Sequence, residues 1–422
     1  MPVGMKLSQS QLRAAALPAT LSIVGVALLL VPRRSRTWLL APFRLFVSLL
    51  YSTSPNKPTK PLVEFDAATE TFSSLVDIDA EPMLLAESKE ELFHEAGIWM
   101  PRSQEWLVTS NRLEAGTVNE HVRIHAIAPS GELRRLHDLE AQIIMANGGT
   151  TDFAGGAFLL SQGMGDTSGS VWRIDADLSS ATRLGPPDGL VLNSPNDIVF
   201  HSASRSLLFT DPAYGYEAQG FRTTFHNTKA VWCTGSEPDL SAEDADWIAL
   251  TPGLFLEQPN GILLNPEETV CYVSDVWHPD WATNPHRHLA RKENQCPEAV
   301  ARRVLAYDLE FEARSEANQS AKLTNRRVFF DLEKEMYGGA AITGYPDGIK
   351  CDEKGNVYAG CGDGVRIYSP QGELIGRLKI EGGIANLAFG GPDGRILLAF
   401  NETRAIAVRM AVAGALGPFA PP

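Results

Sequence analysis

Pro195-Asn196-Asp197-Ile198 begins a stretch that ends sixteen residues later in Phe209-Thr210-Asp211, and Pro259-Asn260-Gly261-Ile262 begins another that ends in Val273-Ser274-Asp275. In both stretches a Pro-Asn pair precedes an apolar run, a turn and a second apolar run. Two short apolar runs separated by turn residues predict a pair of antiparallel strands. A pattern that recurs at a fixed offset indicates a repeat architecture, and the repeat decides the fold before any single element does.

The same offset of sixteen residues occurs four more times, twice in a less regular form. These copies run from Pro346 to Gly362, from Ala385 to Asn401, from Ala146 to Gln162 and from His94 to Ser110. Six units, each of about four short strands, predict an all-β protein with the fold of a six-bladed β-propeller. The interval between the units at 259 and 346 is the longest, which predicts an insertion at about residues 276–302.

A closed propeller needs a strand from the start of the domain to complete its last blade. Residues 405–410 supply a strand of the last unit. Its partner is expected at residues 62–65 or at residues 71–76, and the pattern does not choose between these two segments.

The second residue of every unit carries a side-chain oxygen. These residues are Glu95, Asn147, Asn196, Asn260, Asp347 and Asn386. The innermost strands of a propeller line its central channel, so we expect the six side chains to form a ring. Hard cations such as Ca²⁺ bind six to eight oxygen ligands. Asn and Asp also cap turns, but six of them in register favour a ring of metal ligands.

The formal charge of −14 is unevenly distributed along the chain. Residues 1–60 contain eight basic residues and no acidic residue, whereas residues 61–422 contain 29 basic and 51 acidic residues. An acidic domain lacks the clustered Lys and Arg that bind a phosphate backbone, so we expect no nucleic-acid partner. The composition, 44% hydrophobic and 21% charged, is typical of a folded protein.

Residues 1–60 predict a hydrophobic leader ahead of a propeller domain at residues 61–422. Residues 14–31 form an apolar run of 18 residues, close to the length that spans a bilayer, and three arginines follow it. Residues 37–51 predict an interfacial helix, and residues 52–60 a Pro-rich linker.

We interpret this leader as a single-pass transmembrane signal anchor, which would make the protein membrane-associated. A cleaved secretory signal and an organellar leader are the alternatives. The excess of arginines after the apolar run places the domain on the cytosolic side. Two glycosylation sequons, at Asn318 and Asn401, test this orientation, because modification of either would contradict it.

The five cysteines are too few and too scattered for a disulfide framework, and no C-x-x-C pair occurs. Cys351 and Cys361 could lie on adjacent strands. We expect buried free thiols.

Seven segments carry a resemblance to a known family. They are residues 93–97 (FHEAG), 145–149 (MANGG), 193–197 (NSPND), 209–216 (FTDPAYGY), 258–261 (QPNG), 345–349 (YPDGI) and 386–394 (NLAFGGPDG). On these segments the domain, from about residue 90 to 405, resembles the senescence-marker/gluconolactonase/luciferin-regenerating (SMP-30-like) family, and most of all its fungal lactonohydrolase branch. The leader is not part of the resemblance.

The resemblance implies a calcium-dependent lactonase, a hydrolase that opens a neutral small-molecule lactone. The expected cofactor is Ca²⁺, or another divalent cation, at the mouth of the channel. The ligands carried over by position are Glu95, Asn196, Asn260 and Asp347. The substrate is expected to be an aldonolactone or a secondary-metabolite lactone.

The same resemblance assigns catalytic and substrate-binding roles. Asp347 is expected to act as general base or nucleophile, and Glu95 supplies the second carboxylate. A bound cation polarises the carbonyl group and stabilises the oxyanion of ester hydrolysis. The residues expected to bind substrate are His94, Asn147, Tyr214 and Asn386, and Asn147 and Asn386 are also expected to lie behind the ligands or to reach the ion through a water.

Two departures from the family pattern leave alternatives open. Ala96-Gly97 follows Glu95 where the family often has a proline. The insertion contains His278, His286 and His288, which fit solvated loop residues better than a metal site. The alternative functions are hydrolysis of an organophosphate or aryl ester at the same site, and a non-catalytic propeller that binds a ligand, a partner or calcium.

Overall fold

The computed structural model describes most of the propeller domain. The described residues are 60–152, 154–223, 229–235, 247–251, 256–277, 301–313, 319–332 and 344–415. The predicted membrane leader, the three histidines of the insertion and Asn318 lie outside these ranges. Among the described residues, no helix has the length and apolar character needed to span a membrane.

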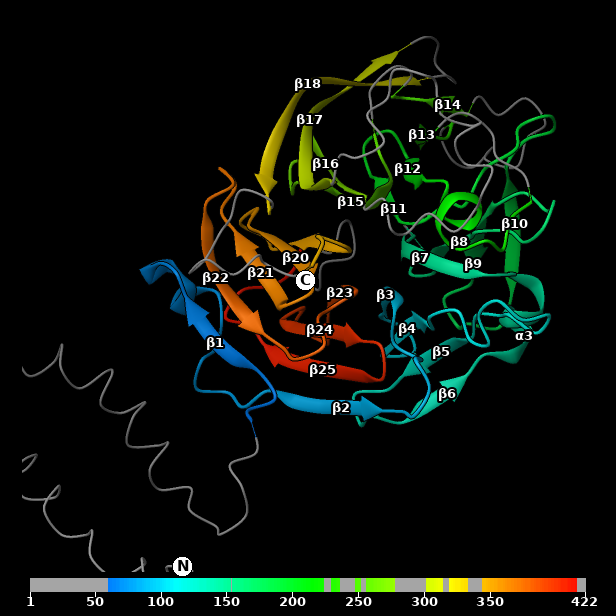
Figure 1. Ribbon diagram of the computed structural model, residues 1–422. Coiled ribbons are helices and arrows are strands. Elements are labelled where there is room, and N and C mark those ends of the chain that lie inside the picture. Colours follow the sequence, from blue (N-terminus) through cyan, green and yellow to red (C-terminus); the bar gives the residue numbers. More distant parts are fainter. Residues whose placement is uncertain are drawn as a thin grey trace, which may run out of the picture. The chain divides into compact units, whose positions relative to one another are not determined.

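Six antiparallel sheets surround a central channel (Figure 1), which confirms the predicted all-β, six-bladed propeller. Each innermost strand contacts the innermost strands of the two neighbouring blades, so the ring is closed. The innermost strands are β3 (Glu95–Met100), β7 (Ala146–Thr151), β11 (Ile198–His201), β15 (Pro259–Leu264), β19 (Ile349–Cys351) and β23 (Asn386–Gly390). All six begin within three residues of the positions predicted from the repeat.

Each blade continues outward from its innermost strand through antiparallel neighbours. The second strands are β4 (Glu105–Thr109), β8 (Ala157–Ser161), β12 (Ser206–Asp211), β16 (Val270–Trp277), β20 (Val357–Cys361) and β24 (Ile396–Asn401). The third strands are β5 (Ile124–Ile127), β9 (Ser170–Ile174), β13 (Ala230–Cys233), β17 (Ala301–Ala313), β21 (Gly364–Tyr368) and β25 (Arg404–Arg409). The outer strands are β6 (Leu133–Arg135), β10 (Ala181–Gly185), β14 (Ile248–Ala249), β18 (Gln319–Asp331), β22 (Leu374–Lys379) and β2 (Met83–Glu87).

The strand that closes the propeller, β2, is neither of the two predicted segments, although Val76 at the end of the second segment forms an isolated antiparallel bridge with Met410. Residues 405–410 lie in β25 as expected, but β25 pairs with β2, which runs along its outer side in Figure 1. Residues 64–67 form β1, a fifth strand beside β22 in the fifth blade. Residues 70–74 form a short 3-10 helix, η2. Both predicted segments are apolar because they cover the fifth and sixth blades, where Phe72 and Val76 join the core.

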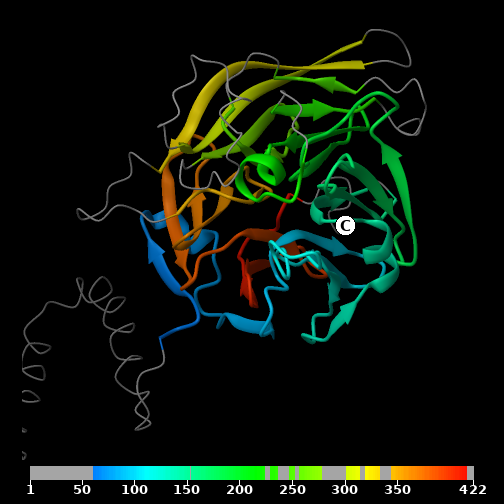
Figure 2. The same ribbon diagram turned by 45° about the vertical axis from the view of Figure 1, so that its right-hand side comes forward.

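Helices are rare in the described part of the domain, as the sequence predicts. A short helix, α3 (His137–Gln142), follows the first blade, and a single π-helical turn spans Tyr214–Ala218. Figure 2 shows this turn over the channel end of the sheets, beside the innermost strands. Four of the five cysteines are described, and all four are buried free thiols, as predicted.

The offset of sixteen residues has a structural cause in the third and fourth blades. Asp275 ends the repeat of the fourth blade, and its Oδ1 accepts the backbone N–H groups of Glu257 (2.7 Å) and Gln258 (3.2 Å). Asp211 does the same for the backbone N–H groups of residues 193–194, both at 2.9 Å. Each aspartate therefore fixes the loop that leads into its own innermost strand, which places the next residue of the register at the channel.

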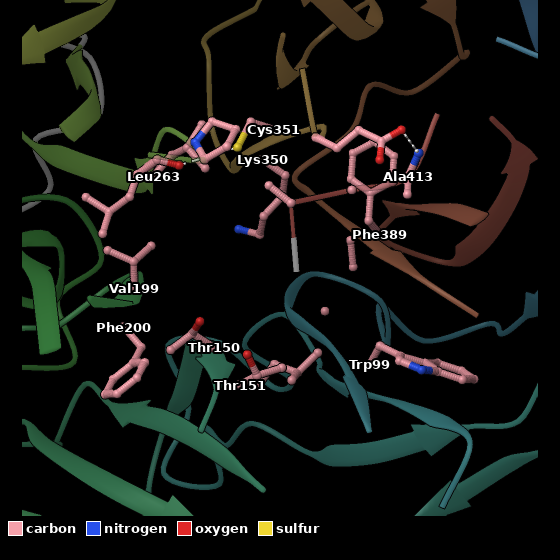
Figure 3. Close-up of a pocket in the computed structure, with 18 of the residues that line it drawn as sticks. Trp99, Thr150, Thr151, Val199, Phe200, Leu263, Lys350, Cys351, Phe389 and Ala413 are labelled. Carbon is pink, nitrogen blue, oxygen red and sulfur yellow. Dashed lines mark hydrogen bonds between the residues drawn. The ribbon is translucent and has the colours of Figure 1, made fainter. Parts of the chain in front are cut away.

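The channel has a separate, wider cavity at the other ends of the innermost strands. This cavity has a volume of about 970 Å³. Val199, Phe200 and Leu263 face it as apolar walls, and the Lys350 side chain points into it (Figure 3). The Lys350 ammonium lies 3.4 Å from the buried carboxylate of Asp197, which separates this cavity from the ring of oxygen-bearing side chains.

Candidate functional site

Five of the six predicted ring residues line one cavity of about 470 Å³ at the end of the channel where the innermost strands begin. They are Glu95, Asn147, Asn196, Asn260 and Asp347, and the predicted substrate-binding residues His94 and Tyr214 line the same cavity. Each ring residue lies within two residues of the start of an innermost strand. The propeller therefore brings together residues that are more than 250 positions apart in the sequence.

Hydroxyl groups of the second strands position the ring residues of the next blade. A side-chain hydroxyl in one blade donates to the backbone carbonyl of a ring residue in the following blade. The three pairs are Thr109 to Asn147 (3.1 Å), Thr210 to Asn260 (2.6 Å) and Ser274 to Asp347 (2.8 Å). These contacts explain why Thr or Ser precedes the last residue of the repeat in three units.

Glycine follows three of the ring residues because neighbouring blades approach closely there. A Cβ atom on Gly148 would lie 2.3 Å from the carbonyl oxygen of Asn196, and one on Gly261 would lie 2.5 Å from that of Asp347. Both distances are too short for any side chain. The Asn-Gly pairs of the sequence are therefore packing requirements of the ring as well as turn signals.

Four oxygen atoms of the ring are buried and accept no hydrogen bond within the described part of the protein. They are Asn147 Oδ1, Asn196 Oδ1, Asn260 Oδ1 and Asp347 Oδ1. A buried polar atom without a partner costs about 1–3 kcal/mol, so such atoms are rare in folded proteins. Four of them around one cavity are the donor set that a hard divalent cation binds.

Glu95 and Asp347 are the two carboxylates of the cavity. Glu95 is only 2% exposed. Burial and the nearby Asp347 carboxylate raise the pKa of Glu95, and burial likewise raises that of Asp347. Two acidic groups that repel each other in a desolvated site are stabilised in their ionised forms by a cation.

Asn386 is the sixth ring residue, and it does not line the cavity. It is fully buried, and its Nδ2 donates to Glu95 Oε2 at 2.5 Å. The structure thus places Asn386 behind Glu95, where it orients that carboxylate, and away from the position expected for a substrate-binding residue. Tyr214 lies within reach of the ring, since Asn260 Nδ2 donates to its hydroxyl oxygen at 3.1 Å.

Sequence reasoning missed Glu402, which contacts the predicted site residue His94. The distance between His94 Nδ1 and Glu402 Oε1 is 2.9 Å. Burial alone would lower the pKa of His94, but the carboxylates of Glu402, Glu95 and Asp347 outweigh it and raise that pKa to about 10. Glu402 belongs to the sequon Asn401-Glu402-Thr403, and nothing in its local sequence indicates this contact, which spans 308 residues.

The cavity has further walls that the register does not mark. These are Gln162, Ala218, Gln219, Val276, Tyr345 and Pro346. The aromatic ring of Tyr345 stacks with the Arg302 guanidinium at 4.7 Å. Tyr345 and the hydroxyl of Tyr214 give the cavity an amphipathic lining, which suits a small polar ring compound better than a purely apolar ligand.

A metal site built only from His, Cys, Asp and Glu is absent from the described ranges, where no cluster of three such side chains occurs. The ring is a different kind of site, because three of its four unpaired oxygens belong to carboxamides. Its unpaired oxygens fit a hard cation such as Ca²⁺, which accepts carboxamide ligands, better than a softer metal that binds imidazole or thiolate.

Comparisons with known proteins agree with this architecture. Residues 298–399 match the family model described as the SMP-30/Gluconolactonase/LRE-like region. A solved gluconolactonase structure from Xanthomonas campestris superposes with a TM-score of 0.59 at 21% sequence identity, and the match covers 85% of this chain and 99% of that one. At this identity the structural match shows the fold alone.

Two curated proteins match over part of their length. A gluconolactonase of Zymomonas mobilis is 25% identical over 238 residues, which cover 53% of this chain and 55% of the relative. A lactonohydrolase of Aspergillus oryzae is 24% identical over 159 residues, which cover 38% of this chain and 33% of the relative. The chain therefore spans about half the length of the first relative and a third of the second. Together the matches confirm the resemblance found in the sequence: residues 298–399 match the SMP-30/Gluconolactonase/LRE-like region, and the chain is similar in sequence to a gluconolactonase and a lactonohydrolase.

Proposed function

We propose that this protein is a hydrolase that opens a lactone ring with the help of a divalent cation, and that the cation is Ca²⁺. Its ligands are the side chains of Glu95, Asn196, Asn260 and Asp347. The observation that carries the proposal is the convergence of buried, unpaired oxygens and two carboxylates on one cavity. The similarity to a gluconolactonase and a lactonohydrolase supports the choice of a lactone.

The residues of the cavity have different roles in the proposed hydrolysis. When bound, a divalent cation polarises the lactone carbonyl and stabilises the oxyanion. Asp347 accepts a proton from the water that attacks the carbonyl carbon, and it returns the proton to the ring oxygen when the carbon–oxygen bond breaks. Glu95, held by Asn386, supplies the second negative charge of the site. The product is a hydroxy acid.

Asn147, His94 and Tyr214 are placed to bind the substrate. Asn147 presents an unpaired Oδ1 that can accept a hydrogen bond from a substrate hydroxyl. Among the described residues, no Lys or Arg lines the cavity. A neutral lactone suits such a site better than an anionic substrate, because two carboxylates face it and the one basic side chain among its described lining residues, His94, is paired with Glu402.

The test is a screen of the full-length protein against γ- and δ-lactones, with calcium and with EGTA. We expect turnover that EGTA abolishes and that Asp347→Ala and Glu95→Gln reduce by at least about 100-fold. Glu268→Gln is a matched control, since Glu268 lies at the other end of the channel.

Three results would contradict parts of the proposal. Turnover that is insensitive to EGTA, or full activity in both variants, excludes the mechanism. Preference for a phosphotriester or an aryl ester over every lactone replaces the substrate. Calcium binding without turnover of any of these compounds identifies a binding propeller.

We also propose that residues 1–60 anchor the protein in a membrane as a single-pass signal anchor. The apolar run at 14–31 and the arginines after it support this proposal. Asn401 is a poor reporter of topology, because it is buried and its Nδ2 donates to the carbonyl of Gly383. Glycosylation at Asn318 therefore remains the test of the cytosolic orientation.

A further inference from the structure

We propose that Glu402 is a positioning residue, which fixes the His94 imidazole so that its Nε2 edge faces the cavity and hydrogen-bonds the bound substrate. This inference rests on the proposed lactone hydrolysis. It concerns a residue that lies outside the ring of oxygen-bearing side chains and whose hydrogen bonds, within the described residues, go to His94, Asn111 and Phe93.

Glu402 is held from three sides around the His94 ring. Its Oε1 lies 2.9 Å from His94 Nδ1, and its Oε2 accepts a hydrogen bond from Asn111 Nδ2 at 3.2 Å. Its backbone carbonyl accepts the N–H of Phe93 at 2.8 Å. The main chain and the side chain of Glu402 are thus both hydrogen-bonded to the segment that carries His94. These contacts fix the orientation of the carboxylate.

The backbone of Glu402 adopts the left-handed conformation, which sets the direction of its side chain. Glu402 occupies the turn between β24 and β25 with φ of 56°. The left-handed conformation is disfavoured by roughly 1–2 kcal/mol for a residue with a β-carbon, and Gly or Asn are the usual residues there. A glutamate at this position has to be held by its surroundings. Here the conformation directs the carboxylate to His94.

The ring of His94 has two different edges, and only one is taken by the protein. Nδ1 contacts Glu402, whereas within the described residues no hydrogen bond to Nε2 occurs. His94 lines the cavity and directly precedes Glu95. Because Nδ1 and Nε2 lie on different edges of the imidazole, fixing Nδ1 on Glu402 leaves Nε2 for a ligand. Without Glu402 the ring could turn over and exchange the two edges.

The chain contains a matched control for the unusual backbone of Glu402. Glu268 is also a glutamate in a hairpin turn, with φ of 57°. Its carboxylate accepts hydrogen bonds from Ser202, by the backbone N–H at 3.0 Å and by the hydroxyl at 2.6 Å. It lies beside the wider cavity at the other end of the channel. Glu268→Gln therefore reproduces the chemical change in the same backbone setting, away from the candidate site.

The experiment measures lactone hydrolysis by the full-length, calcium-loaded protein and its variants. We expect Glu402→Ala to lower kcat/KM by roughly 10–100-fold, the usual effect of removing a group that orients an active-site ligand. Glu402→Gln recovers part of this loss, because its carboxamide oxygen still accepts the Nδ1–H group. Glu268→Gln behaves like the wild type, and all three variants retain the thermal shift that calcium produces.

A double-mutant cycle separates positioning from a merely structural contribution. His94→Ala and Glu402→Ala combined should lose no more activity than His94→Ala alone, since Glu402 acts only through the ring. Additive losses would overturn the proposal, and so would a Glu402→Ala variant as active as Glu268→Gln.

If the wild type hydrolyses no lactone, the proposed function is refuted. A second readout then still tests whether Glu402 orients the His94 ring. In protein labelled with ¹⁵N-histidine, the Nδ1–H signal of His94 should be protected from exchange in the wild type and in Glu268→Gln. It should be lost in Glu402→Ala. A signal that persists in Glu402→Ala would show that Glu402 does not orient the ring.

Discussion

Replacement of Glu95 by glutamine should stabilise the protein without calcium and destabilise it, relative to the wild type, with calcium. In calcium-free protein Glu95 is 2% exposed and lies beside the carboxylate of Asp347. Its hydrogen bond from Asn386 at 2.5 Å survives the change, because the glutamine oxygen is also an acceptor. Glu95→Gln therefore removes a buried charge and its repulsion without removing a contact.

The magnitude follows from burial of the charge. A pKa raised by burial corresponds to about 1.4 kcal/mol for each unit, so removal of this charge should add on the order of 1–3 kcal/mol to the free energy of unfolding. A domain of this size has an unfolding entropy near 0.8 kcal/mol/K, and the thermal midpoint should rise by about 1–4 °C. Calcium at 1,000 times its dissociation constant should add about 4.1 kcal/mol to the wild type, more than the gain of the variant, and almost nothing to the variant.

The assay is thermal unfolding of the full-length protein in EGTA and across a calcium titration. The two melting midpoints should exchange their order as calcium rises. Glu120→Gln is the control, because Glu120 is a buried glutamate that is paired with Arg112 at 2.5 Å and does not line the cavity. It should lower the midpoint in both media by the same amount. A Glu95→Gln variant that is destabilised in EGTA, or that keeps the full calcium shift, would refute the reasoning.

Three further predictions concern single side chains. Asn196→Leu removes an unpaired buried oxygen, so the calcium-free free energy of unfolding should stay the same or rise by up to about 1 kcal/mol. Calcium binding should weaken at least tenfold. A calcium titration by thermal shift checks both, and an unchanged affinity would exclude Asn196 as a ligand. Thr210→Val breaks the hydrogen bond to the Asn260 carbonyl at 2.6 Å and should cost about 1–3 kcal/mol of unfolding free energy, whereas Thr210→Ser keeps the hydroxyl and should cost less than half of that in urea denaturation. Burial lowers the pKa of His125 to about 4, so below pH 6.5 the unfolded chain binds a proton that the folded chain does not. Between pH 7.5 and pH 5 this difference removes about 2 kcal/mol from the free energy of unfolding. The His125→Leu variant should lose about 2 kcal/mol less than the wild type over the same interval, and an equal loss in both proteins would contradict this prediction.

The sequence predicts the innermost strands well because the features behind the pattern are local. Asp211 and Asp275 each contact the loop only 17 to 18 residues before them. The aspartate, the loop and the hairpin between them form one unit of sequence. A repeated local unit is visible in a single chain, and its repetition gives the number of blades.

The closure of the ring could not be predicted in the same way, because it depends on which distant segments meet. β2 pairs with β25 across more than 300 residues, for example at Leu84 and Ile406. Leu62–Phe65 and the segment around Phe72 are equally apolar, and they bury their side chains against the fifth and sixth blades. Apolar character alone predicts burial and does not indicate the partner.

The same limit explains why the sequence did not indicate which ring residue Asn386 contacts, or that Glu402 contacts His94. Both reach the site from the last blade, which meets the first blade only when the ring closes. Asn386 shares the register of the ring residues, but its amide turns to Glu95. Glu402 lies in a two-residue turn, where a charged residue is ordinary in sequence and only its left-handed backbone marks it.

The charges near the channel clarify why this acidic domain suits a divalent cation. Asp197 is balanced by Lys350 at 3.4 Å, and Glu402 lies 2.9 Å from the ring of His94. Glu95 and Asp347 then remain as the two carboxylates of the cavity, and the other ring residues that line it are neutral carboxamides. A ring of six carboxylates would bind a cation more strongly, but its repulsion would oppose folding before the cation arrived. Two carboxylates among carboxamides match a charge of +2, so the local balance, and not the net charge of the domain, determines what the site can hold.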